Sequence, residues 1–188
     1  MSDPGDPLLS QRIRTMQLIA AALLMGVLSF LGIALFLVYV QQNGEGMVPA
    51  QGLPIYSLVA WGMFAVCAPL SIYLPRTMLD SQSRRIAAGE WRPPSGTDAS
   101  AYASEKAQLL AVRQTTMIVG LALLEGSAFM GILAFLSEAN PLALCVTAGA
   151  VVLMLMRFPT EGRSRAWLDE QAEKLVQARQ RDIGEKSV

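Results

Sequence analysis

The sequence predicts an all-helical fold, a four-span transmembrane helical bundle with helical cytoplasmic extensions. Three observations predict it. Of the 188 residues, 53% are apolar and only 16% are charged, which is unusual for a soluble domain. The apolar residues gather in four runs that contain a single charged residue, and the basic residues avoid alternate connections between those runs. A small integral membrane protein shows this pattern.

The four apolar runs are the predicted transmembrane helices. A helix rises roughly 1.5 Å per residue and a hydrocarbon core is about 30 Å thick. Three of the runs have 20 residues or more and the last has 15. Arg157 can snorkel from the end of this short run, and the alternative for it is a buried or re-entrant helix. The runs are Met16–Val40, Leu53–Leu74, Met117–Leu136 and Leu142–Met156.

The distribution of basic residues predicts the orientation. The first connection, 41–52, and the third, 137–140, contain no Lys or Arg. All fifteen basic residues lie before the first run, in the middle connection or after the fourth run. The positive-inside rule then places both termini and the middle connection in the cytoplasm, as in a multi-pass protein of a bacterial inner membrane. An even number of crossings is required, and four satisfies it.

The same pattern divides the chain into three parts. Residues 1–15 form a cytoplasmic N-terminal segment, residues 16–160 form the membrane domain with its cytoplasmic connection 76–112, and residues 161–188 form a cytoplasmic amphipathic helical tail. The second run is expected to continue as a helix into the connection, because the stretch Thr77–Trp91 contains no helix breaker before Gly89. The tail carries a helical stripe of Leu168, Ala172, Leu175, Val176, Arg179 and Ile183.

This stripe in the tail has two interpretations. A helix with one apolar face can dock a cytoplasmic protein partner or a second copy of the chain. It can also pack on the helix of the middle connection or lie on the membrane surface. Glu170 and Lys174 are spaced four residues apart and are expected to pair on the exposed side.

Glu125 is the ionisable side chain that lies deep inside an apolar run. It is eight residues from Met117 and eleven from Leu136, so it is expected close to the bilayer midplane. A charged acid there costs about 2.5 to 3.5 kcal/mol on insertion scales, and no Lys or Arg occurs in another run to pair with it. Desolvation therefore favours a neutral carboxyl, which is both a donor and an acceptor.

Possible partners of this carboxyl are few. Besides backbone carbonyls, the polar candidates in the runs are Ser29, Ser57, Ser71, Thr147 and the indole of Trp61. Close helix contact is expected around it, because small residues at helical spacing let helix backbones approach. The small residues expected at these contacts are Gly126 and Gly131 in the third run and Gly26 and Gly32 in the first.

Three interpretations of Glu125 remain open. An intramembrane acid often marks a proton or cation site. It can instead make a structural hydrogen bond that sets the register between helices, or it can form a contact between copies in an oligomer.

The first and third runs suggest an internal repeat with an offset of 99 residues. At this offset Arg14 matches Arg113, Phe30 matches Phe129 and Gly32 matches Gly131. Such a match predicts two tandem helical hairpins related by an axis along the membrane normal. Chance agreement within a small apolar alphabet is the alternative.

Composition argues against several functions. The chain has no His and two Cys, so an imidazole metal site and His-dependent catalysis are excluded and a disulfide framework is not expected. A formal net charge of zero gives no sign of nucleic-acid binding. We expect no enzyme, no cofactor and no metal, and we expect the lipid bilayer as the main partner.

The third run also carries two resemblances. The stretch Ala122–Phe129, together with Phe135-Leu136 and Arg157–Thr160, resembles a family of small uncharacterised bacterial four-helix membrane proteins. The resemblance covers most of the chain and implies a four-helix membrane fold without implying an activity.

The second resemblance covers one helix. The stretch Leu124–Leu136 is similar to the ion-carrying helix of rotary ATP synthase proteolipid (c) subunits. This resemblance implies that Glu125 would be the counterpart of their ion-binding acid. The chain departs from that family because it lacks the Arg-Gln-Pro loop motif, and because its acid lies on the first helix of a hairpin.

Three functional hypotheses follow from the sequence. The first is a non-enzymatic membrane protein in which Glu125 makes a buried polar contact inside a bundle or homo-oligomer. The second is a proton- or cation-linked channel or carrier subunit that uses Glu125. The third is a membrane anchor or adaptor that acts through residues 161–188.

Overall fold

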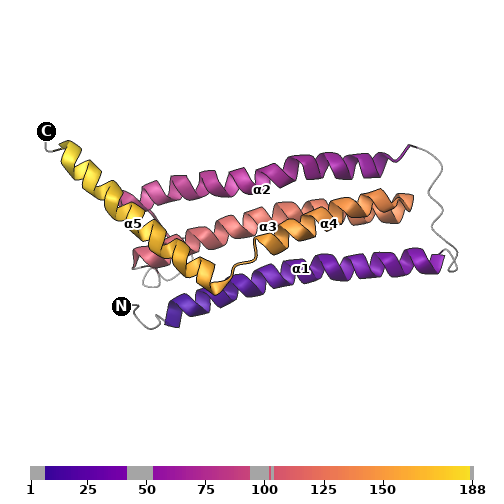
Figure 1. The fold of residues 1–188 in the computed structure, drawn as a ribbon, viewed down its shortest axis with the longest axis horizontal. Coiled ribbons are helices and arrows are strands. Elements are labelled where there is room, and N and C mark those ends of the chain that lie inside the picture. The colour runs from indigo at the N-terminus through magenta and orange to yellow at the C-terminus, as the bar shows by residue number, and fades with distance from the viewer. Residues whose placement is uncertain (1–6, 42–52, 94–101, 103, 187–188) are drawn as a thin grey trace. The chain divides into compact units, whose positions relative to one another are not determined.

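The structure, a computed structural model, describes residues 7–41, 53–93, 102 and 104–186 (Figure 1). These residues form helices and no strand, so the predicted all-helical fold is confirmed. The helices extend beyond the apolar runs into polar sequence. They are α1 (Pro7–Gln41), α2 (Ile55–Ala87), α3 (Glu105–Glu138), α4 (Pro141–Met156) and α5 (Glu161–Lys186).

Among the described helices, α1, α2 and α3 are long and apolar enough to cross a membrane. With 16 residues, α4 alone is too short to be counted among the candidate membrane-crossing helices. It can be counted as a membrane crossing only together with the first part of α5, Glu161–Gln171, as one broken span. The prediction of apolar membrane-crossing helices is therefore supported for three helices, and a fourth crossing depends on how α4 is counted.

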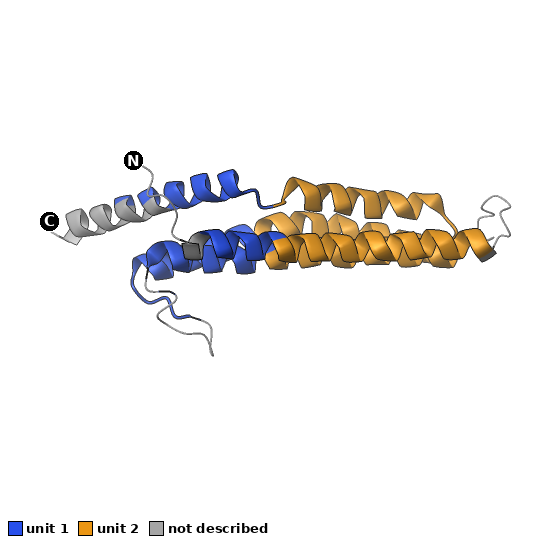
Figure 2. Ribbon diagram, turned by 90° about the horizontal axis from the view of Figure 1, so that it is seen from below, with its two compact units in different colours: residues 1–17, 74–117, 159–188 blue, residues 18–73, 118–158 orange. Residues whose placement is uncertain are grey.

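The chain divides into two compact units (Figure 2). Unit 1 comprises residues 1–17, 74–117 and 159–188, and unit 2 comprises residues 18–73 and 118–158. Helices α1, α2 and α3 each contribute one segment to each unit, whereas α4 belongs to unit 2 and α5 to unit 1.

Unit 2 is built around α3. Half of the most apolar stretch of α3 is buried, against 17% for α1 and α2, so α3 is the central helix. One buried cluster of unit 2 consists of Val38, Ala60, Ala134, Phe135, Ala143 and Val146. Several of these residues are small, which is how helices in lipid gain close packing.

The hairpin of α3 and α4 shows how small residues allow this packing. A Cβ on Gly131 would lie 2.6 Å from Thr147 Oγ1 and 3.0 Å from the carbonyl oxygen of Ala143. The Thr147 hydroxyl donates to the carbonyl of Ala128 at 3.1 Å, which ties α4 to α3. Glycine at position 131 is therefore required by the close approach of the two helices.

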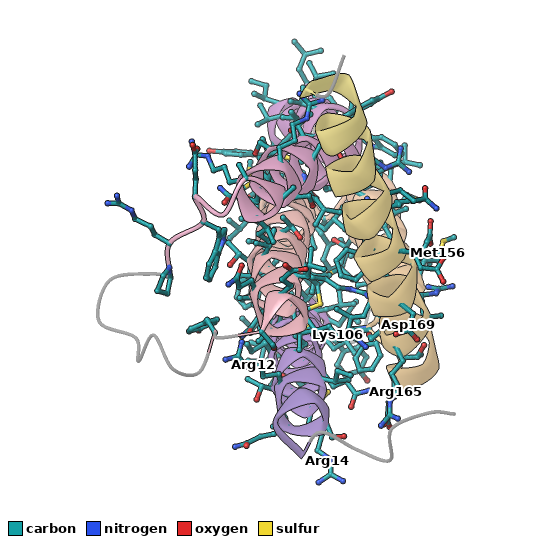
Figure 3. The ribbon with its side chains drawn as sticks, turned by 90° about the vertical axis from the view of Figure 1, so that its left-hand side faces the viewer. Arg12, Arg14, Lys106, Met156, Arg165 and Asp169 are labelled. Carbon is teal, nitrogen blue, oxygen red and sulfur yellow. The ribbon has the colours of Figure 1, made fainter. Side chains whose placement is uncertain are left out.

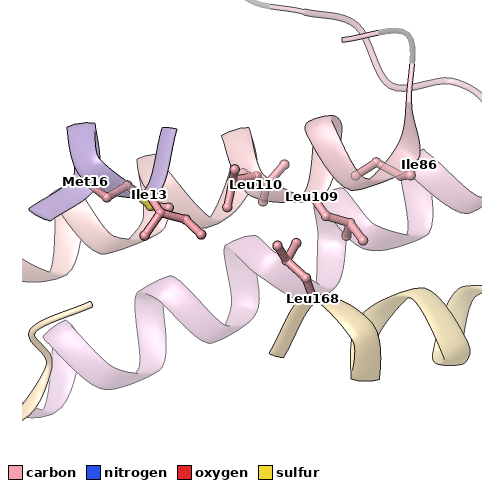
Figure 4. Packing of buried hydrophobic residues seen from close by; sticks show 7 residues of the cluster. Ile13, Met16, Ile86, Leu109, Leu110 and Leu168 are labelled. Carbon is pink, nitrogen blue, oxygen red and sulfur yellow. The ribbon is translucent and has the colours of Figure 1, made fainter. Parts of the chain in front are cut away.

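Unit 1 has a separate apolar core of Ile13, Met16, Ile86, Leu109, Leu110, Val112 and Leu168 (Figure 4). Here α5 is held by polar contacts as well. Arg113 lies over the Trp167 ring at 4.4 Å and donates to the Ser164 carbonyl at 3.2 Å. Figure 3 shows Lys106 and Asp169, whose charged atoms are 3.6 Å apart on the surface.

The tail helix thus packs on the middle connection through Leu168. The expected pair of Glu170 and Lys174 is confirmed, with 2.6 Å between Oε1 and Nζ. The side chains of Ala172, Leu175, Val176, Arg179 and Ile183, which complete the predicted stripe, lie outside the described residues.

Two helix ends follow from local sequence. After α2, Gly89 adopts a φ of +72°, the left-handed conformation that closes many helices. The amides of Gly89 and Glu90 donate to the carbonyls of Ile86 and Arg85, which is the Schellman arrangement. Thus Gly89 ends the helical continuation of the second run, as the sequence predicts.

Between α3 and α4 the turn is very short. Ala139 has a φ of +49° and donates its amide to the Phe135 carbonyl at 2.8 Å. Asn140 then caps α4 by accepting from the Leu142 amide at 3.1 Å, and Pro141 fills the first helical position. The short connection makes α4 turn back along α3.

The two units differ sharply in their surfaces. Among the described residues, every exposed large apolar side chain belongs to unit 2, except Leu74 at the boundary. Described charged residues in unit 2 are limited to Glu125, Glu138 and Arg157. An apolar surface suits hydrocarbon, whereas the described residues of unit 1 expose no large apolar side chain apart from Leu74.

Candidate functional site

Glu125 lies in the middle of the apolar stretch of α3, facing α1. Its Oε1 atom is 3.8 Å from the position that a Cβ would occupy on Gly26. One turn further along both helices, the rings of Phe30 and Phe129 meet edge to face with centroids 5.4 Å apart. The missing side chain of Gly26 therefore leaves room for the carboxyl between two helices in contact.

These two contacts also fix the relative direction of α1 and α3 within unit 2. Gly26 meets Glu125 and Phe30 meets Phe129, so both contacts have the same sequence offset. Two helices that keep a constant offset run parallel to each other. A parallel α1 and α3 require the chain to return between them, which is the direction that α2 supplies.

Glu125 has no hydrogen-bond partner in the part of the chain that the structure describes. Its side chain is half-buried, so a part of the carboxyl is open to the surroundings of unit 2. The polar side chains that the sequence suggested as partners of Glu125 make other contacts or are exposed.

Two of the candidate partners have other hydrogen bonds. The Thr147 hydroxyl donates to Ala128 and the Ser71 hydroxyl donates to Ala68 at 2.6 Å. Ser29 is exposed on α1, and Trp61 is exposed and meets the Phe64 ring edge to face. The structure therefore brings Gly26 to Glu125 and does not bring these polar side chains to it.

The predicted helix-contact glycines have different surroundings. Gly131 has the closest neighbours and lies at the contact between α3 and α4. A Cβ on Gly126 would lie 3.4 Å from Met63 Cε, and one on Gly32 would meet no atom within 4 Å. Gly26 and Gly131 are therefore the two glycines whose missing side chain is used by a neighbouring polar group.

Ser57, the remaining candidate, belongs to a second polar site at Glu138. The Glu138 carboxylate accepts from the Ser57 hydroxyl at 2.5 Å and from the amides of Tyr56 and Ser57 at 2.6 and 3.0 Å. Asn140 adds a bond from its amide nitrogen to the Ser57 hydroxyl at 3.3 Å. Glu138 thereby satisfies first-turn amides of α2.

Sequence reasoning missed this role of Glu138. The only signal was indirect, because α2 begins after Pro54 without a Ser, Thr, Asp or Asn to cap it. Glu138 lies two residues beyond the apolar run that ends at Leu136. Burial alone would raise its pKa, but the hydrogen bonds from Ser57 and Tyr56 outweigh burial and lower the pKa below its usual value.

Arg157, just after the C-terminal end of α4, also bonds to the backbone of α2. Its guanidinium donates to the carbonyl of Ser71 in α2 at 2.7 Å. In a regular helix this carbonyl would accept from residue 75, but Pro75 has no amide hydrogen. Arg157 thus satisfies a carbonyl that the proline leaves free.

The described residues contain no group of three or more His, Cys, Asp or Glu that could hold a metal ion. Cys67 and Cys145 are free thiols, the first half-buried and the second exposed on the apolar surface of unit 2. No family model, no curated protein and no solved structure matches this chain.

Proposed function

We propose that the protein is a non-enzymatic, four-span protein of a bacterial inner membrane that assembles through the mid-membrane carboxyl of Glu125. Unit 2 would lie in the bilayer, and unit 1, with both termini, would lie in the cytoplasm. The separation of exposed apolar residues from charged residues between the two units supports this placement.

The fourth crossing is supported by the ends of α4. At roughly 1.5 Å per residue, its 16 residues extend about 24 Å, a little less than the hydrocarbon core. Its N-terminus follows the tight turn at Asn140, and Arg157 at its other end is basic and bonded to α2. A short helix with polar residues at both ends can cross with modest thinning of the bilayer.

One observation supports the assembly most strongly. Glu125 has no hydrogen-bond partner among the described residues, and its carboxyl is half-buried beside Gly26 rather than enclosed. A polar group left unsatisfied in hydrocarbon costs several kcal/mol. A neutral carboxyl is self-complementary, because it donates one hydrogen bond and accepts another. A second copy of this chain therefore supplies the missing partner.

The experiment measures association of the purified protein in detergent and in nanodiscs. Glu125→Gln keeps a donor and an acceptor and should retain the oligomer mass. Glu125→Leu has neither, so association should weaken roughly tenfold or more. Leu133→Ala, on an exposed residue of the same helix, is the matched control and should leave the mass unchanged. A monomeric wild type, or an unchanged Glu125→Leu, contradicts assembly through this residue.

The same unpaired carboxyl supports a second candidate function, a proton- or cation-linked channel or carrier subunit. In that case Glu125 would react with a hydrophobic carbodiimide, and Na⁺ or high pH would slow the reaction. Glu125→Gln separates the two candidates, because it should preserve assembly while abolishing ion movement. The absence of carbodiimide labelling under every condition would remove the second candidate.

A further inference from the structure

Unit 1 contains a pocket of about 200 Å³ between the end of α2 and α3. One side is formed by α2 and the turn that follows it, and the other side by α3. Apolar and polar lining side chains come from both helices, and Arg92 lies in the turn after α2. The lining residues are Met78, Gln82, Trp91, Arg92, Ala111, Val112, Thr115 and Thr116.

Three side chains of this pocket have unused hydrogen-bond donors. The guanidinium of Arg92, the amide of Gln82 and the indole N–H of Trp91 make no hydrogen bond among the described residues. The hydroxyls of Thr115 and Thr116 already donate to the carbonyls of Ala111 and Arg113. None of the lining residues is acidic, so the pocket offers donors and positive charge to an anion.

The neighbouring sequence adds a second positive charge. Arg85 follows Gln82 by three residues on α2, so it lies on the flank of the helix that faces the pocket. Arg84 points to a different side, at about 200° from Gln82 around the helix axis. The nearest acids along the chain, Asp80 and Glu90, are both exposed and are not among the lining residues.

In the proposed topology, the edge of the pocket nearest the membrane lies at the depth of lipid headgroups. Thr115 and Thr116 directly precede Met117, where the apolar run of α3 begins. Met78 lies four residues, or about 6 Å, after the end of the apolar run of α2 at Leu74. Bilayer headgroup regions are about 5 to 7 Å thick on each side. An amphiphile could therefore reach the pocket from the membrane.

We propose that this pocket binds the phosphate group of an anionic phospholipid. The planar guanidinium of Arg92 matches two phosphate oxygens, and Gln82 and Trp91 supply neutral donors. The apolar side chains Met78 and Val112 contact the start of the lipid tails. Basic pockets between helices at the cytoplasmic surface have this preference. The phospholipid would belong to the inner leaflet of the membrane, and this placement rests on the proposed topology.

A free phosphate ion could bind to the same donors. Only a phospholipid has tails that contact the apolar lining, so the lipid should bind more tightly than inorganic phosphate. The test is native mass spectrometry of the full-length protein in detergent, titrated with phosphatidylglycerol or with phosphatidylcholine. A second arm adds inorganic phosphate at millimolar concentration to the phosphatidylglycerol complex. We expect tight binding of one phosphatidylglycerol, weaker binding of phosphatidylcholine, and no displacement by phosphate.

Two variants test the site and one serves as the control. Arg92→Gln removes an exposed guanidinium and should weaken phosphatidylglycerol binding about tenfold or more. Ala111→Phe fills the pocket without changing charge and should also weaken it. Arg84→Gln has the same change in charge on another side of α2 and should bind within about twofold of the wild type.

Several results would overturn the proposal. Equal weakening by Arg92→Gln and Arg84→Gln would show diffuse attraction to a basic surface. Unchanged binding in Arg92→Gln, or displacement of the lipid by inorganic phosphate, would also contradict it. The experiment is done in detergent, so a wrong topology would leave the binding result intact and would change only the leaflet.

Discussion

At the scale of single residues, the polar contacts of unit 2 divide into satisfied and unsatisfied ones. Glu138 accepts from the first-turn amides of α2, which have no partner within that helix. Arg157 donates to the Ser71 carbonyl, which lacks its helical partner because residue 75 is proline. Glu125 has no such partner in the described chain. A structural role therefore accounts for the first two residues, and Glu125 is the residue for which we propose a partner in a second copy of the chain.

Gly131 provides the first prediction. Gly131→Ala should destabilise the protein by about 1–3 kcal/mol, because its Cβ would overlap Thr147 Oγ1 and approach the Ala143 carbonyl. Thermal unfolding in detergent measures the effect. Gly32→Ala is the matched control, since nothing lies within 4 Å of its new Cβ. Equal unfolding temperatures for the two variants would contradict the close α3–α4 contact.

The second prediction concerns the pH dependence of the Glu138 contact. Hydrogen bonds from Ser57 and Tyr56 lower the pKa of Glu138, so the charged form is favoured in the folded protein. The stabilisation is fully present above the pKa of an unperturbed Glu and is lost as the pH falls through the lowered pKa. Infrared spectra of the isotope-labelled carboxylate, with Glu138→Gln as the blank, should show that Glu138 stays ionised at pH values at which an unperturbed Glu is already protonated. Protonation at or above the usual Glu pKa would refute this.

At the scale of elements, the apolar runs predicted which part of each helix is apolar but not where the helix ends. The first run begins at Met16, whereas α1 begins at Pro7, because polar residues such as Gln11 continue a helix without marking it by hydropathy. Signals based on backbone conformation were more exact, and Gly89 ends α2 as predicted. The turn at Ala139 has no such signal, because alanine is rare at positive φ.

The turn between α3 and α4 gives the third prediction. Ala139→Gly should stabilise the protein by about 0.5–1 kcal/mol, since glycine adopts a φ of +49° without the steric cost of a Cβ. The effect should appear as a higher unfolding temperature. Ala166→Gly, at an exposed position inside α5, is the opposing control and should destabilise. A lower unfolding temperature for Ala139→Gly would show that the turn has another conformation.

At the scale of the whole molecule, composition and periodicity predicted an all-helical membrane protein, and the contacts between distant residues could not be predicted. Ser57 was an expected partner of Glu125 and is bonded to Glu138 instead, 81 residues away in the chain. Hydropathy reports the depth of a residue and not the rotation of its helix. The proposed repeat of α1 and α3 stays a prediction, although the residues it pairs, Phe30 and Phe129, are in contact.

The most direct test is the location of the two ends of the α3–α4 hairpin. In a background with Cys67→Ala and Cys145→Ala, single cysteines are introduced as Gly46→Cys, Glu90→Cys and Glu161→Cys, and a membrane-impermeant maleimide is added to intact cells. Gly46 itself lies outside the described residues. The four-span account predicts labelling at position 46 and protection at both 90 and 161 until the membrane is opened. Labelling at 161 with protection at 90 would contradict it, because α4 would then not return to the cytoplasm.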